Sequence, residues 1–373
     1  MKKIFVVTGE HSGDIHASKV VEALLAKNSE LIIEGIGGEN LRTKGVKLFS
    51  DQKKMGAVGL SAKIILDHFT LGKRLVDYLI NDYKPDLVLL VDYGAFNLAI
   101  SKYLKKAGIK VFYYIPPQVW ASRKWRINTI KKNIDNVLCI FPFEKKMYDK
   151  MGIKSHYCGH PLVSQIEKPA DREAFFKKHD FDVNKKLVSI FPGSRVFELQ
   201  HLMDTFIKSS VELQKRHPDL QFCISQAPNL SDEVYNKYLK EVDFKVVKGE
   251  NQALLSVSDA LILASGTVAL EASLYTTPMI IAYRGPSLFY FIYLLVRSIK
   301  QVSLPNIIAE KDIVPELIQF ELSVNNIAYE IERLLYDEQY RAENISQLSD
   351  VKSMLSDKIS CVEVANSILK EIS

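Results

Sequence analysis

Short apolar runs alternate with helical patterns along the whole chain, and this alternation restricts the folds that the chain can adopt. Strands that alternate with helices form parallel sheets, because each helix carries the chain back over one face of the sheet in a right-handed crossover. We predict helices at, for example, residues 96–107 and 197–216. The strands that we predict cover residues 3–8, 31–36, 87–92, 110–115, 136–141, 187–191, 221–225 and 260–264. The sequence therefore predicts an α/β fold.

The length of the chain indicates two domains. Single hydrophobic cores rarely grow beyond about 250–300 residues, and this chain has 373. The segment 165–186 is charged and falls between two series of strands, so we place the linker there. The predicted domains are residues 1–165 and 185–340, followed by C-terminal helices at 341–373. Such Rossmann-like domains would face a cleft and bind ligands at the carboxyl ends of their strands.

Charge is distributed unevenly over the chain. Residues 1–150 carry a formal charge of +10, whereas the remaining residues carry −5. A basic first domain suits an anionic substrate or an anionic membrane surface. Nucleic acid is not expected as a partner, because we find no helix-turn-helix pattern, zinc-finger spacing or RNP-type aromatic motif.

The cysteines and the apolar stretches predict a cytoplasmic protein. Cys139, Cys158, Cys223 and Cys361 are scattered without metal-binding or disulfide spacing, which fits a reducing compartment. The N-terminus enters a strand directly and lacks the layout of a signal peptide. No apolar stretch approaches the ~20 residues that a membrane-spanning helix needs.

The most informative segment reads SGTVALE at residues 265–271 and follows an apolar run. The first N–H groups of a helix have no intrahelical partner, and the helix dipole attracts anions to that end. Ser265, Gly266 and Thr267 could therefore hold a diphosphate. Glu271 lies one helical turn further on the same face, where it could accept hydrogen bonds from a sugar or ribose diol. The alternative is an ordinary strand–turn–helix joint that Thr267 caps.

Two further joints have the same form. The segment PGSR at 192–195 follows a predicted strand, and Arg195 could contact a phosphate through its two-pronged guanidinium. Near the N-terminus, the loop GEHSGD at 9–14 lies between a strand and a helix that we predict at 15–27. This loop lacks the full G-x-G-x-x-G fingerprint of dinucleotide sites. Neither a P-loop, a zincin motif nor a G-x-S-x-G elbow is present.

An ordered set of motifs now carries a resemblance. The motifs are GEHSGD (9–14), DYGAFN (92–97), PPQVWAS (116–122), GHPL (159–162), FPGSR (191–195), SGTVALEA (265–272) and SLPNIIA (303–309). In this order they resemble the landmarks of the lipid-A-disaccharide synthases, glycosyltransferase family 19. The chain departs from the family pattern at two places. His11 stands where the family commonly has Ala, and DYGAFN replaces the common DAPDFN, so Ala95 takes the place of an acidic residue while Asp92 is retained.

The resemblance implies a fold type, a reaction and a location. The fold would be GT-B, with the last helices packing back on the N-terminal domain. The enzyme would be an inverting hexosyltransferase, peripheral on the cytoplasmic face of the bacterial inner membrane, and a homodimer is compatible with the family. It would join the donor UDP-2,3-diacylglucosamine to the acceptor 2,3-diacylglucosamine 1-phosphate. The products would be UDP and lipid A disaccharide 1-phosphate with a β-1,6 linkage, and no cofactor is expected.

Such a reaction needs a base for the acceptor hydroxyl and hydrogen-bond donors for the departing diphosphate. Asp92 ends a predicted strand, at the edge where open α/β sheets bind ligands, and is our first candidate for the base. The alternative for Asp92 is a cap of the following helix. Glu10 and His11 are further candidates, and Asp14 could equally cap the helix at 15–27.

The remaining motif residues have less certain roles. Because Ala95 removes a second carboxylate, we expect no metal ion, and Arg195 would neutralise the leaving group together with the helix end near Gly266. The resemblance makes Asn306 a contact to substrate or nucleotide. His160 could take part or could be structural, and the aromatic and basic cluster at 120–126 could bind an acceptor phosphate or form a solvated face.

Two segments break the alternating pattern. Residues 288–296 are nearly all apolar, too short to span a bilayer, and could form a buried helix or lie against lipid or a partner. Residues 55–75 combine glycines, apolar residues and closing basic residues, which suits a flap over acyl chains; the alternative is an ordinary crossover.

Two other functions compete with this prediction. One is another sugar-nucleotide enzyme of the GT-B type, such as a UDP-GlcNAc 2-epimerase or a lipid II-type transferase. The other is a membrane-docked nucleotide-binding module without catalysis. The apolar segments argue against a purely soluble sugar substrate, and three joints together with Asp92 and Arg195 argue against a module without chemistry. Turnover of a UDP-sugar would separate these functions.

Overall fold

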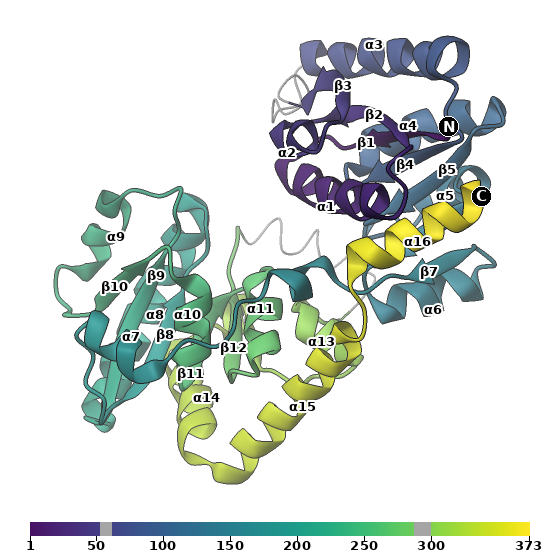
Figure 1. The fold of residues 1–373 in the computed structure, drawn as a ribbon. Coiled ribbons are helices and arrows are strands. Elements are labelled where there is room, and N and C mark those ends of the chain that lie inside the picture. Colours follow the sequence, from purple (N-terminus) through teal and green to yellow (C-terminus); the bar gives the residue numbers. More distant parts are fainter. Residues whose placement is uncertain (53–61, 287–299) are drawn as a thin grey trace. The chain divides into compact units, whose positions relative to one another are not determined.

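The computed structural model describes residues 1–52, 62–286 and 300–373 (Figure 1). The chain forms two compact units. Unit 1 comprises residues 1–164 and 355–373, and unit 2 comprises residues 165–354. Each unit is built on one parallel sheet, so the predicted α/β class with two Rossmann-like sheets is confirmed.

Unit 1 contains a seven-stranded sheet in the order β3-β2-β1-β4-β5-β6-β7. The direction of strand progression reverses between β1 and β4, and open α/β sheets bind ligands at the carboxyl ends of the strands at such a switch point. Strand β4 reads LVLLV and is buried along its whole length, as expected of a central strand in a parallel sheet covered on both faces. The strands are β1 (Lys3–Val7), β2 (Ile32–Gly37), β3 (Lys47–Asp51), β4 (Leu87–Val91), β5 (Lys110–Tyr114), β6 (Asn136–Cys139) and β7 (Ser155–Tyr157).

The helices of unit 1 come from both ends of the chain. Helix α16 packs against α1, and it is tied to the sheet by a hydrogen bond of 2.7 Å between the hydroxyls of Tyr114 and Ser360. Glu371 adds ion pairs to Lys110 and Lys154. The helices are α1 (His11–Lys27), α2 (Glu39–Thr43), α3 (Ala62–Tyr78), η2 (Leu79–Tyr83), α4 (Gly94–Lys106), α5 (Arg126–Asn133), α6 (Pro142–Lys150), η3 (Pro161–Gln165) and α16 (Ser360–Ile372).

Unit 2 contains a six-stranded sheet in the order β10-β9-β8-β11-β12-β13. Its switch point lies between β8 and β11. The strands are β8 (Lys186–Phe191), β9 (Leu220–Gln226), β10 (Lys245–Lys248), β11 (Ala260–Ala264), β12 (Met279–Tyr283) and β13 (Glu316–Ile318). The helices are α7 (Arg172–Lys178), α8 (Val196–Arg216), α9 (Asp232–Leu239), α10 (Asn251–Val257), α11 (Val268–Tyr275), α13 (Leu304–Ala309), η4 (Gln319–Glu321), α14 (Val324–Tyr336) and α15 (Glu338–Ser356).

Two local predictions are wrong. The segment that we assigned to a linker contains helix α7, which buries Phe175 and Phe176 and packs against α10. The side chain of Asp171 caps α7 by accepting hydrogen bonds from two backbone N–H groups, and two adjacent buried phenylalanines make the segment part of the core. Helix α1 begins at His11 rather than at residue 15, so most of the predicted loop GEHSGD is the first turn of that helix.

Among the described helices, none is both long and apolar enough to cross a bilayer. The apolar run at 288–296 and residues 55–61 of the segment 55–75 lie outside the described residues, so the predicted roles of the two segments stay predictions.

Candidate active site

The start of α11 is an open helix end. The backbone N–H of Ser265 donates to the carbonyl of Ala282, but those of Gly266, Thr267 and Val268 donate to no acceptor in the described part of the chain. Thr267 occupies the N-cap position without a capping hydrogen bond from its side chain. Gly266 and Thr267 are exposed, and a Cβ added to Gly266 would meet no atom within 4 Å. These unpaired donors at the positive end of a helix are suited to an anion.

Glu271 lies one turn further along α11. Its burial raises the pKa of its carboxyl group. Within residues 62–286, where its neighbours in α11 and the adjacent strands lie, no hydrogen bond or ion pair to this carboxylate is seen. A carboxylate that is partly desolvated and has no partner is available to accept hydrogen bonds from a ligand hydroxyl.

The start of α8 differs, because a carboxylate of the protein bonds the backbone just before this helix. Glu198 Oε2 accepts hydrogen bonds from the backbone N–H groups of Ser194 at 2.8 Å and Arg195 at 3.2 Å. Its Oε1 accepts a hydrogen bond of 2.9 Å from Arg195 Nη1. The backbone N–H groups of Ser194 and Arg195 are therefore occupied, and the guanidinium of Arg195 is a group that this joint offers to an anion.

Asp92 follows β4 directly, at the switch point of unit 1. Asp92 and Tyr93 both have a positive φ, of 49° and 50°, which is uncommon for residues other than glycine and marks local backbone strain. This conformation is held by hydrogen bonds that the carbonyl of Asp92 accepts from Asn97 Nδ2 and the Tyr113 hydroxyl, each at 2.7 Å. Tyr93, not Asp92, is the N-cap residue of α4, and no side chain caps that helix. Asp92 thus lies one residue before the N-cap, and its carboxylate accepts a hydrogen bond from the backbone N–H of Tyr93.

Glu10 and Asp92 are electrostatic neighbours. Glu10 follows β1 and Asp92 follows β4, and these two strands pair directly. Burial raises the pKa of Asp92. Burial and the nearby charge of Asp92 raise the pKa of Glu10. Two carboxyl groups with raised pKa values at a sheet switch point are a common arrangement for proton transfer.

The other residues of the first motif have separate roles. His11 is exposed at the start of α1. Asp14 is fully buried and does not cap its own helix. Its carboxylate accepts hydrogen bonds from the backbone N–H groups of Gly38 at 2.7 Å and Asn40 at 3.0 Å, so it caps the neighbouring helix α2.

Asn306 is fully buried in α13, and its amide is saturated by the protein. Its Oδ1 accepts from the N–H groups of Ile313 and Val314, and its Nδ2 donates to the carbonyl of Val314 and to Glu316 Oε1. An amide has two donor and two acceptor positions, so Asn306 has none left for a ligand. The contacts give it a structural role in holding the chain before β13.

His160 and Trp120 also make contacts that fit structural roles. His160 Nδ1 accepts a hydrogen bond from the backbone N–H of Leu162, and burial lowers the pKa of this histidine to about 3, so it is neutral. Trp120 is buried and donates to Glu144 Oε1 at 3.0 Å. Trp125, in contrast, has an exposed fraction of 70%.

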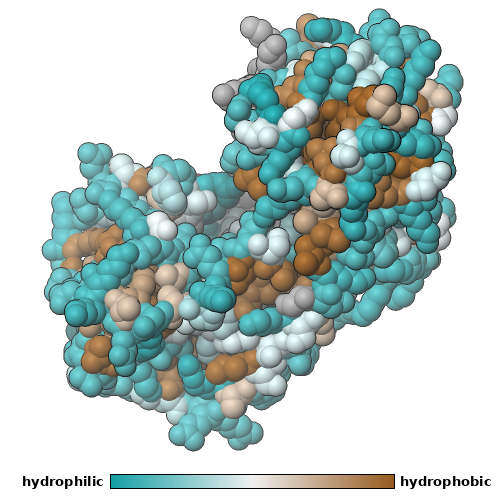
Figure 2. Space-filling model, in the orientation of Figure 1, coloured by the Kyte–Doolittle hydropathy of each residue, from teal (hydrophilic) through white to brown (hydrophobic). Residues whose placement is uncertain are grey.

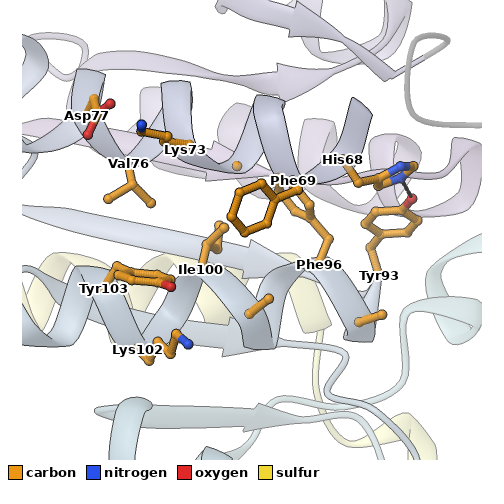
Figure 3. Close-up of a pocket in the computed structure, with 13 residues that line it drawn as sticks. His68, Phe69, Lys73, Val76, Asp77, Tyr93, Phe96, Ile100, Lys102 and Tyr103 are labelled. Atoms are coloured by element: carbon orange, nitrogen blue, oxygen red, sulfur yellow. Dashed lines mark hydrogen bonds between the residues drawn. The ribbon is translucent and has the colours of Figure 1, made fainter. Parts of the chain in front are cut away.

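A pocket of about 880 Å³ opens between α3 and α4 (Figure 3). Phe69, Val76, Phe96 and Ile100 point into it from the two helices, and Lys73 and Lys102 lie at its edges. Figure 2 shows apolar residues gathered on the face of unit 1. This pocket is not predictable from the sequence pattern, because its walls come from two helices that only the fold brings together.

Tyr93 connects the pocket to the carboxyl pair. Its ring lines one end of the pocket, where its hydroxyl is hydrogen-bonded to His68 Nε2. The same ring lies against Gly9, since a Cβ at Gly9 would fall 2.4 Å from its carbon atoms. The apolar pocket therefore ends next to the residue that precedes Glu10.

The fold and these sites define the class of the protein. Two parallel α/β units, each with polar side chains at its switch point, are the arrangement of GT-B enzymes that use nucleotide sugars. Two solved structures share this fold across the chain. A glycosyltransferase of kitacinnamycin aligns with a TM-score of 0.64 and 12% identity over 100% of this chain and 99% of that one. UDP-GlcNAc 2-epimerase from Neisseria meningitidis, bound to UDP-GlcNAc, aligns with a TM-score of 0.61 and 14% identity over 99% of each chain.

The chain belongs to the lipid-A-disaccharide synthetase family, whose model matches residues 4–371. A lipid-A-disaccharide synthase from Myxococcus xanthus is 33% identical over 372 residues, which cover 99% of this chain and 97% of that protein. The resemblance found in the sequence is thus confirmed. So is the predicted enzyme class, a hexosyltransferase of lipid A biosynthesis.

The open end of α11 gives a first testable prediction. Gly266→Ala should leave the thermal midpoint unchanged, because the Cβ meets no protein atom and Gly266 does not have a positive φ. The same Cβ would fill space that a phosphate needs to approach the N–H groups. We expect the affinity for UDP to fall about tenfold, or ~1.4 kcal/mol, as measured by titration calorimetry. Unchanged affinity would place the diphosphate elsewhere.

Proposed function

We propose that the enzyme transfers 2,3-diacylglucosamine from its UDP derivative to 2,3-diacylglucosamine 1-phosphate, with inversion at the anomeric carbon. The observations that carry this proposal are the N–H donors at the start of α11 in unit 2, which bond no described acceptor, and, separately, a carboxyl pair at the switch point of unit 1. Family membership supports the overall reaction. The two sites support our assignment of donor binding to unit 2 and of the base to unit 1.

In the proposed step, the 6-hydroxyl oxygen of the acceptor attacks the anomeric carbon of the donor sugar. The bond between that carbon and the diphosphate oxygen breaks, and UDP leaves with the bonding electrons. The hydroxyl proton passes to the carboxylate of Asp92, for which Glu10 is the nearest alternative. A single displacement of this kind inverts the anomeric configuration and gives the β-1,6 linkage.

The proposed donor site uses the contacts of unit 2. The N–H groups at Gly266 and Thr267 and the guanidinium of Arg195 would bind the diphosphate and stabilise its charge as it leaves. Glu271 would accept hydrogen bonds from the ribose diol, which fits a half-buried carboxylate that bonds no other residue of the described part of the chain. We expect these groups to neutralise the leaving group without a metal ion.

The proposed acceptor site uses the pocket of unit 1. An acyl chain suits a cavity lined by Phe69, Phe96 and Ile100, and Lys73 and Lys102 at its edges suit a phosphorylated lipid in an anionic surface. The pocket ends at Tyr93, which directly follows the proposed base in the sequence. A lipid whose acyl chain is bound in this pocket would thus have its sugar close to Asp92. The enzyme would work from the cytoplasmic face of the inner membrane.

The test is turnover by the purified protein with the two lipid substrates in detergent micelles. Release of UDP that requires both substrates, and that continues in EDTA, is the expected result. A 2-epimerase would change the configuration at C2 of UDP-GlcNAc without an acceptor. A binding module would bind the UDP-sugar donor but would not release UDP from it. Strict dependence on Mg²⁺ would overturn the proposed stabilisation of the leaving group.

The exposed apolar residues of α3 give a second prediction. Leu66 and Phe69 have exposed fractions of 64% and 70%, so replacing both by Ser should leave the fold intact. Binding to vesicles that contain anionic lipid should weaken at least about fivefold. A fully buried side chain contributes about 1.5–3 kcal/mol, and even a third of that for each of the two residues amounts to about 1 kcal/mol. Sedimentation with vesicles measures this change. Ile359→Ser, which removes a side chain with an exposed fraction of 60% outside the pocket, is the matched control.

A further inference from the structure

Glu198 contacts three anion-binding groups of the PGSR joint: the backbone N–H groups of Ser194 and Arg195 and the guanidinium of Arg195. Its side chain is 20% exposed, whereas that of Arg195 is 78% exposed. One carboxylate oxygen is fixed by two backbone N–H groups of the helix end, and the other accepts from the Arg195 guanidinium. The carboxylate is therefore held in place by the backbone, and the arginine is held by the carboxylate.

The backbone of the joint makes room for this arrangement. Gly193 has a φ of +104°, and a Cβ at this position would lie 2.1 Å from Glu198 Oε2. A side chain at residue 193 would displace the carboxylate. Asn229 adds a hydrogen bond of 2.9 Å from its Nδ2 to the carbonyl of Ser194, which fixes the loop from the other side. The backbone of the joint therefore leaves room for the carboxylate of Glu198 in this position.

This geometry has a consequence for Arg195. A long, exposed side chain samples many rotamers, and an anion that binds it must order it. An exposed ion pair usually contributes little, because both side chains must be ordered. Here Glu198 is already ordered by the helix end, so only Arg195 loses freedom. A guanidinium has five N–H donors, and a single one points to Glu198, so the others remain for a second anion.

We propose that Glu198 is a positioning residue for the reaction, which holds the guanidinium of Arg195 in the orientation that receives the departing diphosphate. This inference rests on the proposed function of Arg195. It divides the donor site into two kinds of anion contact: backbone N–H groups at the start of α11, and a preoriented side chain before α8, where Glu198 occupies the backbone N–H groups of Ser194 and Arg195.

The test is a double-mutant cycle of Glu198→Gln and Arg195→Ala, with kcat/KM measured for the transferase reaction. The glutamine oxygen can still accept from the N–H groups of Ser194 and Arg195, so the thermal midpoint should not change. Its neutral amide no longer holds the guanidinium. We expect kcat/KM to fall about fivefold to tenfold in Glu198→Gln, mainly in kcat, and to show no further change when the substitution is added to Arg195→Ala.

Three outcomes would overturn the inference, and they are distinguishable. An equal loss in both backgrounds would mean that Glu198 supports the fold alone. Tighter UDP binding and a higher kcat/KM in Glu198→Gln would mean that the carboxylate competes with the diphosphate. An unimpaired Arg195→Ala enzyme would remove Arg195 from the proposed function itself. Glu212→Gln removes another ion pair on the same helix, to Arg216, and should leave kcat/KM unchanged.

Discussion

Replacing Asp92 by Asn should lower turnover about 10²–10⁴-fold while the affinity for UDP stays nearly unchanged, because the amide cannot take the proton of the acceptor hydroxyl. The fold should tolerate this change. Asn adopts positive φ values readily, and the hydrogen bonds from Asn97 and Tyr113 reach the backbone carbonyl of residue 92. The amide oxygen of Asn can still accept from the backbone N–H of Tyr93, as the Asp92 carboxylate does. Steady-state kinetics, UDP titration and a thermal melt, taken together, measure the three quantities.

The pH profile gives an independent check on the base. Burial raises the pKa of Asp92, so the acidic limb of kcat/KM should lie above the ordinary range of an aspartate and should disappear in Asp92→Asn. Glu10→Gln is the comparison, since its carboxyl also has a raised pKa. If Asp92→Asn keeps near-normal turnover and Glu10→Gln does not, the base is Glu10.

Replacing Arg195 by Ala should remove about 2–4 kcal/mol of transition-state stabilisation, as for loss of one preorganised donor to a developing negative charge. The protein should remain folded, because the side chain of Arg195 is 78% exposed and the backbone N–H of residue 195 keeps its bond to Glu198. The loss should appear in kcat as well as in kcat/KM, since charge on the diphosphate grows as the sugar departs.

Arg216→Ala is a matched control for this prediction, because it removes an arginine at the other end of the same helix. Its kcat/KM should stay within about twofold of the unmodified enzyme, the range usual for surface substitutions. A loss in Arg195→Ala that is confined to KM would assign the arginine to ground-state binding of the donor and contradict its role in leaving-group stabilisation.

The central strands of both sheets were predictable from sequence, and the edge strands were not. Strands such as β4 and β11 are buried on both faces, so they read as uninterrupted apolar runs. Strands β3, β7, β10 and β13 lie at the sheet edges and are short or partly exposed, so their sequences lack such runs. Strand β12 was missed although it is apolar.

The candidate site was predictable where function follows from a strand end. Arg195 and Ser265 follow β8 and β11, and Glu10 and Asp92 follow β1 and β4, so each pair lies at one switch point. The sequence could not reveal which hydrogen-bonding groups are already bonded within the protein. The bonds of Asp14 to α2 and of Asn306 to the residues before β13 join side chains to backbone groups that local pattern does not identify.

Because α16 packs on α1, unit 1 can complete its fold only after the C-terminal end of the chain has been synthesised. Unit 1 is nearly complete once β7 has left the ribosome, yet the helix that covers α1 begins at residue 360. At ordinary rates of translation, roughly 10–40 s separate the two. During that interval, the residues of unit 1 that contact Ser360, Val364 and Ile368 in the finished protein are not covered by α16. Until the last helix emerges, the nascent first unit therefore exposes surface of α1 that the finished protein covers.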